Sequence, residues 1–185
     1  MNGSMRCMAS GIALVLSGAR AAPEPPPTLS ITLAPDTPDR DGHVRAIDLT
    51  LVVTGADTAP GAPLFHLPAT ANTVVTSADD ITALTAADAR GPLSLAAQDT
   101  PADDSNTDRV WSADRAVAGT VTIRYRVTIE PARPPLVAPQ YEVRTEGGTV
   151  SGAANSFVLL PADATPRHVA VDLKHIDIAN LAVSG

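Results

Sequence analysis

The feature that most constrains this chain is an unbroken alternation of polar and apolar residues over residues 120–130. The apolar series is Val121, Ile123, Tyr125, Val127 and Ile129. Threonines and arginines occupy the positions between them. A period of two in β-branched and aromatic residues is typical of a strand with one buried and one solvated face. The segment therefore predicts a strand of an antiparallel β domain, and it bears on no chemistry directly.

Further short strands are predicted along the chain, separated by turn signals. They are expected at residues 29–33, 45–54, 64–67, 72–77, 141–145, 149–150 and 168–173, and a further strand is expected to begin at 93–95. An apolar segment at 157–160 ends at Pro161. Pro68 is expected to end the strand at 64–67, and a turn at Gly119 is expected to precede the alternating segment. Gly147-Gly148 is expected to form a turn between two strands.

Residues 79–90 are compatible with two structures. Ser77-Ala78-Asp79-Asp80 could cap an alanine-rich helix, whereas the same stretch also fits a strand that turns at Arg90-Gly91. We favour the strand because the surroundings are β. The fold class expected from the whole pattern is all-β, an antiparallel β-sandwich of about nine or ten short strands with little helix.

The N-terminal residues have the anatomy of a secretory signal peptide. A short basic start precedes an apolar stretch centred on residues 12–16, and Ala19-Arg20-Ala21 forms a small-x-small cleavage site. The alternative is a short membrane anchor, but a spanning helix needs about 20 apolar residues. We expect a signal peptide over 1–21, a proline-rich spacer over 22–28 and a β-sandwich domain over 29–185, exported to the periplasm or the extracellular space.

Composition narrows the possible partners and chemistry. Cys7, the only cysteine, lies in the predicted signal peptide, so we expect no disulfide or thiolate chemistry in the mature chain. Loss of Arg6 and Arg20 leaves eleven basic residues against twenty acidic ones, a net charge of −9. A charge of this sign argues against nucleic acid and anionic membrane surfaces as partners.

No motif in the sequence declares a reaction. The histidines His43, His66, His168 and His175 lack the His-Glu-x-x-His spacing of a zinc site. The acidic loop at 99–108 could hold calcium, but its spacing is not that of an EF-hand and a solvated turn is favoured. The chain has no Gly-x-Ser-x-Gly elbow and no glycine-rich phosphate loop. We therefore expect no catalytic, cofactor-binding or metal-binding residue, no cofactor, and a core position for Trp111.

The order of elements resembles the N-terminal β domain of the glycyl aminopeptidase family of zinc metallopeptidases. The resemblance covers residues 29–185. Its motifs are Phe65-His66-Leu67-Pro68, the segments 80–86 and 88–91, an acidic loop ending in Trp111, the strand 121–127, residues 147–152, 157–161 and 168–173. Where the family carries Trp-x-Pro-Gly, this chain has Ala69-Thr70-Ala71-Asn72.

The resemblance implies a non-catalytic module, because the zinc ligands and general base of the family lie in a following domain. Gly185 falls about where that domain would begin, so the implied partner is a C-terminal catalytic peptidase domain whose cleft this chain helps to shape. An apolar patch is then expected to stay exposed near the C-terminal strand. The alternatives are a free-standing exported ligand-binding or adhesion module, and a small hydrolase with an unrecognised triad.

Overall fold

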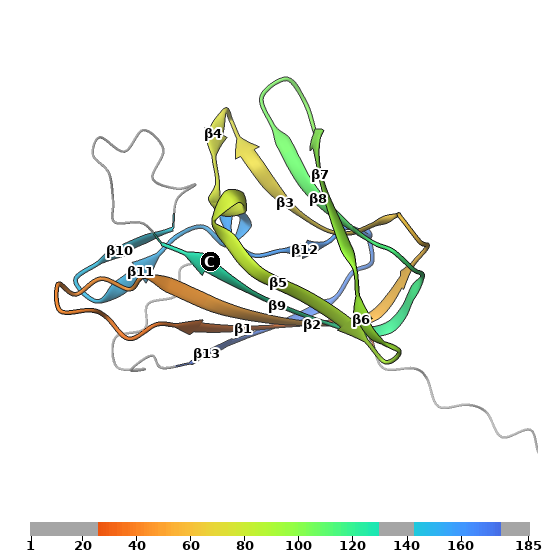
Figure 1. Ribbon diagram of the computed structural model, residues 1–185, viewed down its shortest axis with the longest axis horizontal. Coiled ribbons are helices and arrows are strands. Elements are labelled where there is room, and N and C mark those ends of the chain that lie inside the picture. The colour runs from red at the N-terminus through yellow and green to blue at the C-terminus, as the bar shows by residue number, and fades with distance from the viewer. Residues whose placement is uncertain (1–25, 130–142, 175–185) are drawn as a thin grey trace, which may run out of the picture.

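A computed structural model describes residues 26–129 and 143–174, which form two facing β-sheets and a small hairpin (Figure 1). The expected all-β sandwich is confirmed. Thirteen strands are described, more than expected, because several are only two or three residues long. The predicted signal peptide and most of the predicted spacer lie outside the described residues.

The larger sheet has six strands in the order β13-β1-β2-β9-β5-β6. Their bounds are β1 Thr28–Pro35, β2 Ala46–Thr58, β5 Ile81–Asp88, β6 Gly91–Leu93, β9 Val117–Thr128 and β13 His168–Leu173. All neighbours in this sheet are antiparallel except β1 and β13, which are parallel. One parallel pair is thus a departure from the purely antiparallel sandwich expected.

The second sheet has the order β12-β3-β8-β7, with β4 paired to β3. Its strands are β3 Pro63–Ala71, β4 Val74–Val75, β7 Leu95–Pro101, β8 Thr107–Ala113 and β12 Leu160–Pro161. The chain passes from the first sheet to the second at Ser94, between β6 and β7. Figure 1 shows β7 and β8 diverging from β5 with distance from that corner. Strands β10 Arg144–Glu146 and β11 Thr149–Ser151 form a separate hairpin around the predicted glycine turn.

The alternating segment lies where its pattern predicts, in the centre of the sandwich. The side chains of Val121, Ile123 and Val127 are completely buried, and Tyr125 is 3% exposed. They face Phe65 and Leu67 of the second sheet, which are also buried. Trp111 occupies the core as expected. Aliphatic packing between the two inner faces therefore supplies the main stabilisation.

Three details differ from the expectations. Strand β3 was expected to end before Pro68 but continues through it. Its pairing with β8 is irregular between Pro68 and Thr70, so the N–H that proline lacks is missing at an irregular part of the ladder. Gly119 is not in a turn but within β9, where a φ of 88° accompanies a register shift against β2. The segment preferred as a strand over residues 79–90 begins with a single 3₁₀ turn, η1 Ser77–Asp80, before β5.

Candidate docking surface

Strand β13 continues the inner face of the six-stranded sheet beyond the part that the second sheet covers. In register with β1, Val169 lies beside Leu29 and Val171 beside Ile31. Paired residues of neighbouring strands project to the same face of a sheet, so the two valines extend the apolar rows of the core. Leu29 and Ile31 are 4% and 7% exposed.

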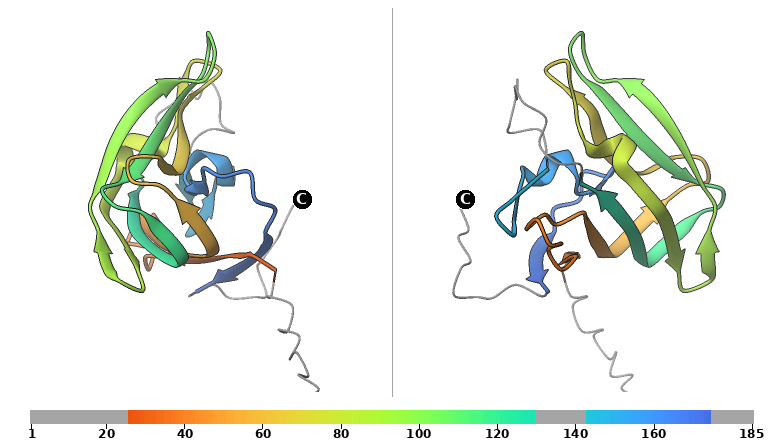
Figure 2. Two further views of the ribbon diagram at one scale, coloured as in Figure 1. Left: turned by 90° about the vertical axis from the view of Figure 1, so that its right-hand side faces the viewer. Right: turned by 60° about the vertical axis from the view of Figure 1, so that its left-hand side comes forward.

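The two valines themselves are open to solvent. Val169 is 61% exposed and Val171 is 58% exposed, the highest values among the exposed large apolar residues of the described chain. Figure 2 shows β13 as the outermost strand of its sheet, on the side away from β5 and β6. The second sheet ends at β12, which has only two residues. The expected exposed apolar patch near the C-terminal strand is therefore present.

The outer face of β13 is polar, which makes the strand amphipathic. His168, Ala170 and Asp172 alternate with the valines and lie beside hydroxyl-bearing residues of β1. Lys174 forms an ion pair with Asp172 just beyond the strand. Solvent on this face is expected, whereas exposure of the valine face leaves apolar area in contact with water at a cost of roughly 25 cal/mol per Å².

A nearly buried arginine holds the start of β13 in place. The Arg167 side chain is 5% exposed and its guanidinium donates to both Asp163 oxygens, at 2.6 and 2.7 Å. It also donates to the Thr165 carbonyl. Through the hydrogen bonds from Arg167, the pKa of Asp163 falls to about 2. This bidentate pair fixes the turn that leads into β13, so the exposed face has a defined orientation.

A recess lies where the two sheets diverge. It has a volume of about 550 Å³, and its lining combines the apolar side chains of Ile81, Leu84, Ala97 and Trp111 with the charged side chains of Asp79, Asp99 and Arg109. Its rim is charged, because Arg109 bridges Asp79 and Asp99 at 2.7 Å each. The bridge connects β8 to β7 and to η1, and the carboxylate of Asp99 is the main cause of the raised pKa of Arg109.

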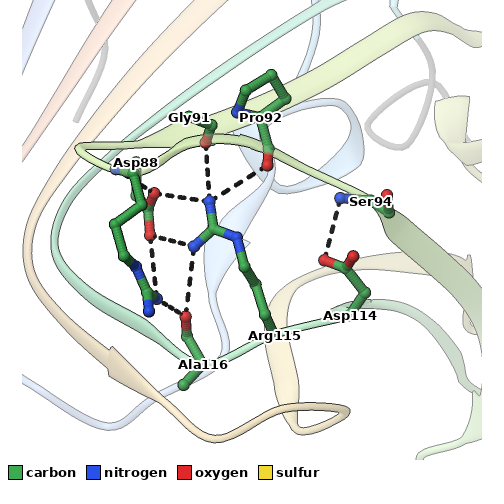
Figure 3. A network of polar contacts seen from close by, with 8 residues as sticks. Asp88, Gly91, Pro92, Ser94, Asp114, Arg115 and Ala116 are labelled. Carbon is green, nitrogen blue, oxygen red and sulfur yellow. Dashed lines mark hydrogen bonds and ion pairs between the residues drawn. The ribbon is translucent and has the colours of Figure 1, made fainter.

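Another polar cluster fastens the corner between the sheets (Figure 3). Asp88 at the end of β5 has a side chain only 1% exposed, and it receives a bidentate pair from Arg115 at 2.7 and 2.8 Å. Arg115 also donates to the carbonyls of Gly91 and Pro92. The hydrogen bonds from Arg115 lower the pKa of Asp88. Because its groups satisfy one another, we assign this cluster a structural role.

The residues considered as metal ligands do not converge. Within residues 26–129 and 143–174 no three His, Cys, Asp or Glu side chains lie close enough together to hold a metal ion. His66 Nδ1 lies 3.7 Å from Asp108. His43 is half-buried, and its Nδ1 has no hydrogen-bond partner among the residues that the structure describes. His168 is exposed on the outer face of β13, and His175 lies outside the described residues.

The acidic loop at residues 99–108 is largely a β-hairpin. Its first residues belong to β7 and its last to β8, which leaves residues 102–106 as the turn. Asp103 accepts from the Ser105 amide and the Asn106 side chain, while Asp99 is paired with Arg109. Asn106 in turn accepts from the Asn72 amide at 2.8 Å, which joins this tip to that of the β3–β4 hairpin. These carboxylates stabilise turns and ion pairs.

Sequence reasoning located β13 and its apolar face but missed the arginine clusters. The alternation at residues 169–173 was sufficient for the strand. The pairs Asp88–Arg115 and Arg109–Asp79 join residues 27 and 30 positions apart. No local spacing identifies such pairs, because the register between strands determines them.

Among the described residues no helix is long and apolar enough to cross a bilayer. No family model and no curated protein matches the chain. The architecture is that of a β-sandwich with one mixed sheet and one antiparallel sheet. Several solved structures contain a portion with some similarity to it.

One such structure is an aminopeptidase N family protein from Idiomarina loihiensis, with 14% identity and a TM-score of 0.48, covering 78% of this chain and 22% of that one. A two-domain M1 zinc metallopeptidase variant bound to L-tryptophan has 16% identity, a TM-score of 0.37, and coverage of 81% and 32%. An M1 zinc metallopeptidase variant from Deinococcus radiodurans, bound to a Tyr-Ser-Ala substrate, has 17% identity, a TM-score of 0.34, and coverage of 79% and 30%.

The chain thus spans between about a fifth and a third of the length of these structures. At identities of 14–17%, the similarity concerns backbone arrangement and not activity. The activities named above belong to the solved structures.

Proposed function

We propose that this chain is an exported, non-catalytic β-sandwich module that packs against the catalytic domain of a zinc aminopeptidase and helps to shape its substrate cleft. The observation that carries the proposal is the uncovered inner face of β13. Val169 and Val171 continue the rows of the core but are 61% and 58% exposed. An apolar sheet face in water is typical of a surface that another domain covers.

The sequence resemblance supplies the identity of that domain. In the family whose β domain this chain resembles, the catalytic domain follows the β domain. Strand β13 is the last described element, and residues 175–185 follow it. Eleven residues span at most about 40 Å when fully extended, so a domain joined after Gly185 would start within reach of β13.

The first test is the gene. Reading the nucleotide sequence past Gly185 should reveal an open frame with a His-Glu-x-x-His segment within a few hundred bases. A stop codon directly after Gly185 would contradict the proposal and favour the free-standing module.

The second test uses the product of the full reading frame. Replacing Val169 and Val171 by lysine should uncouple the domains, because burial of an unpaired ammonium at the contact is unfavourable. We expect a lower melting temperature of the catalytic domain and a raised KM for aminoacyl substrates. Ala170→Lys, on the outer face of the same strand, is the matched control and should leave both unchanged. Equal melting temperatures and equal KM values for the native protein, the variant with both valines replaced and Ala170→Lys would contradict packing through this face.

Export is a separate part of the proposal and has its own test. The signal-peptide pattern over residues 1–21 predicts that the protein recovered from outside the cytoplasm begins at Ala22. N-terminal sequencing of that protein decides the point. An intact Met1 on protein that remains in the cytoplasmic fraction would contradict export. That result would not bear on packing through the valine face of β13.

One observation favours a second candidate function, a free-standing ligand-binding module. The recess of about 550 Å³ between the diverging sheets is lined by apolar side chains that include Trp111 and by the charged side chains of Asp79, Asp99 and Arg109. The neighbouring hairpin tips are joined through Asn72 and Asn106. Such a module would bind its ligand with the isolated chain, and Leu84→Arg would abolish that binding while Val171→Lys would not.

A further inference from the structure

We propose that the partner domain engages β13 by strand addition: an extended segment of that domain pairs with the free edge of β13 and lays its own alternate apolar side chains beside Val169 and Val171. The inference rests on the proposed function, which supplies the partner. It goes further by naming the backbone groups that make the contact and the kind of segment that fits them.

The first step is the direction of the backbone groups of β13. The His168 amide donates to the Pro27 carbonyl at 3.0 Å, and the Lys174 amide donates to the Leu33 carbonyl at 2.8 Å. In a parallel pair, every second residue directs both its N–H and its C=O to the same neighbour. The even-numbered residues of β13 therefore face β1, and Val169, Val171 and Leu173 direct their N–H and C=O groups away from the sheet.

The second step is that β13 occupies the end of the sheet order, with no strand beyond it in the described chain. Its odd-numbered residues consequently present an unpaired row of donors and acceptors along one edge. The same residues carry the exposed apolar side chains. A strand that added to this edge would satisfy the backbone groups and shield the valine side chains in one contact.

The third step compares β13 with the other edges of the two large sheets. Edge strand β12 has two residues and ends in Pro161. Edge strand β7 ends in Pro101, and its Asp99 is engaged by Arg109. At the other end of the six-stranded sheet, edge strand β6 has three residues and contains Pro92, and the part of β5 that β6 leaves open is irregular between Thr82 and Thr85. Prolines, bulges, charges and short length are the usual protections against unwanted pairing.

Strand β13 carries little of this protection. It has six residues, no proline and an uninterrupted register with β1 from His168 to Leu173. An edge that is long, regular and apolar on one face is a template for another strand. Among the described edges of the large sheets, this one is the edge prepared for a partner.

The chemistry of the partner segment follows from the two faces of β13. Its residues next to the valines should be β-branched or aliphatic, because they continue the apolar rows of Leu29 and Ile31. Its residues on the other face lie beside His168 and Asp172 and should be polar. The fitting partner is therefore an extended segment with strict polar/apolar alternation.

The test is amide hydrogen exchange at residue resolution, on the 185-residue chain and on the product of the full reading frame. In the 185-residue chain we expect fast exchange at Val169, Val171 and Leu173, and slow exchange at Ala170 and Asp172. In the longer product the three odd-numbered amides should slow by at least about tenfold, because they acquire hydrogen-bond acceptors.

A matched pair of variants sharpens the test. Val171→Pro removes one outward-facing N–H and is tolerated in an edge strand whose N–H points to solvent. In the longer product it should restore fast exchange at Val169 and Leu173. Val171→Thr keeps the N–H and the branched shape, and should retain the slow exchange.

The outcomes separate this inference from the proposed function. Fast odd-numbered amides in the longer product, together with loss of thiol labelling at a Val169→Cys variant, would mean that the face packs without strand pairing. That result overturns strand addition and leaves the proposed function standing. Fast amides with undiminished labelling would overturn both.

Discussion

At the scale of single residues, Tyr125 has two roles in the same fold. Its ring lies in the core, and its hydroxyl joins the central strand to the segment before β12. The hydroxyl donates to the Phe157 carbonyl at 3.0 Å and accepts from the Leu159 amide at 2.9 Å. Burial raises the pKa of Tyr125, so the group stays neutral across the physiological range.

We therefore predict that Tyr125→Phe lowers the free energy of unfolding by about 1–3 kcal/mol, because the buried Phe157 carbonyl and Leu159 amide both lose the hydroxyl as hydrogen-bond partner. Urea denaturation followed by Trp111 fluorescence measures it. Thr122→Val, on the solvated face of the same strand, is the control and should change stability by less than about 0.5 kcal/mol. Equal effects of the two substitutions would show that the hydroxyl contributes nothing.

At the scale of elements, the irregular positions of strands decide where the sheet bends. Gly119 shows this, since β9 passes through it with a φ of 88° opposite the register shift in β2. A Cβ at this position would meet no atom within 4 Å. Any cost of a side chain at Gly119 is therefore a cost of backbone conformation alone.

We predict that Gly119→Ala destabilises the chain by roughly 1–2 kcal/mol, and that Gly119→Asn costs less because asparagine tolerates positive φ better. Thermal unfolding of the two variants gives the comparison. Alanine and asparagine of equal stability to glycine would mean that β9 can adopt an ordinary strand conformation here.

The same scale shows what could be predicted from the sequence. Strands with strict alternation, at residues 45–54, 121–129 and 169–173, were located because one face of each is buried or continues the core. The passage of β3 through Pro68 and the glycine inside β9 were missed, since each depends on a bulge that only the partner strand determines. The exposed apolar patch on β13 was foreseen. The parallel pairing that orients its edge was not, because β1 and β13 lie far apart in the sequence.

At the scale of the whole molecule, paired carboxylates link stability to pH. The pKa is lowered for Asp39, Asp88, Asp99, Asp103 and Asp163. Asp80 is the exception, since burial and then the charge of Asp79 raise its pKa. A carboxyl group whose folded-state pKa lies below its unfolded value stabilises the fold above about pH 4, and this stabilisation is lost as the pH falls through the folded value.

We accordingly predict that the urea midpoint falls as the pH is lowered from 5 to about 2.5. Asp88→Asn should lower the midpoint at pH 7. Its difference from the native chain should narrow in acid, because the Asp88 carboxyl is protonated more readily in the unfolded chain than in the fold, where Arg115 holds its pKa low. Asp57→Asn, at an exposed position in β2, is the control, and its urea midpoint should run parallel to the native curve as the pH changes. A urea midpoint that stays constant or rises as the pH falls would contradict a stabilising role for the ionised carboxylates.

The pairing of the first strand with the last has a consequence for biogenesis. Thr28 is in register with His168, 140 positions further along the chain. An emerging polypeptide cannot complete the large sheet until synthesis has passed Leu173, and contacts of such long range form slowly. If the chain is exported as proposed, this delay would keep the nascent chain unfolded and competent for translocation. The large sheet would then form only after translocation.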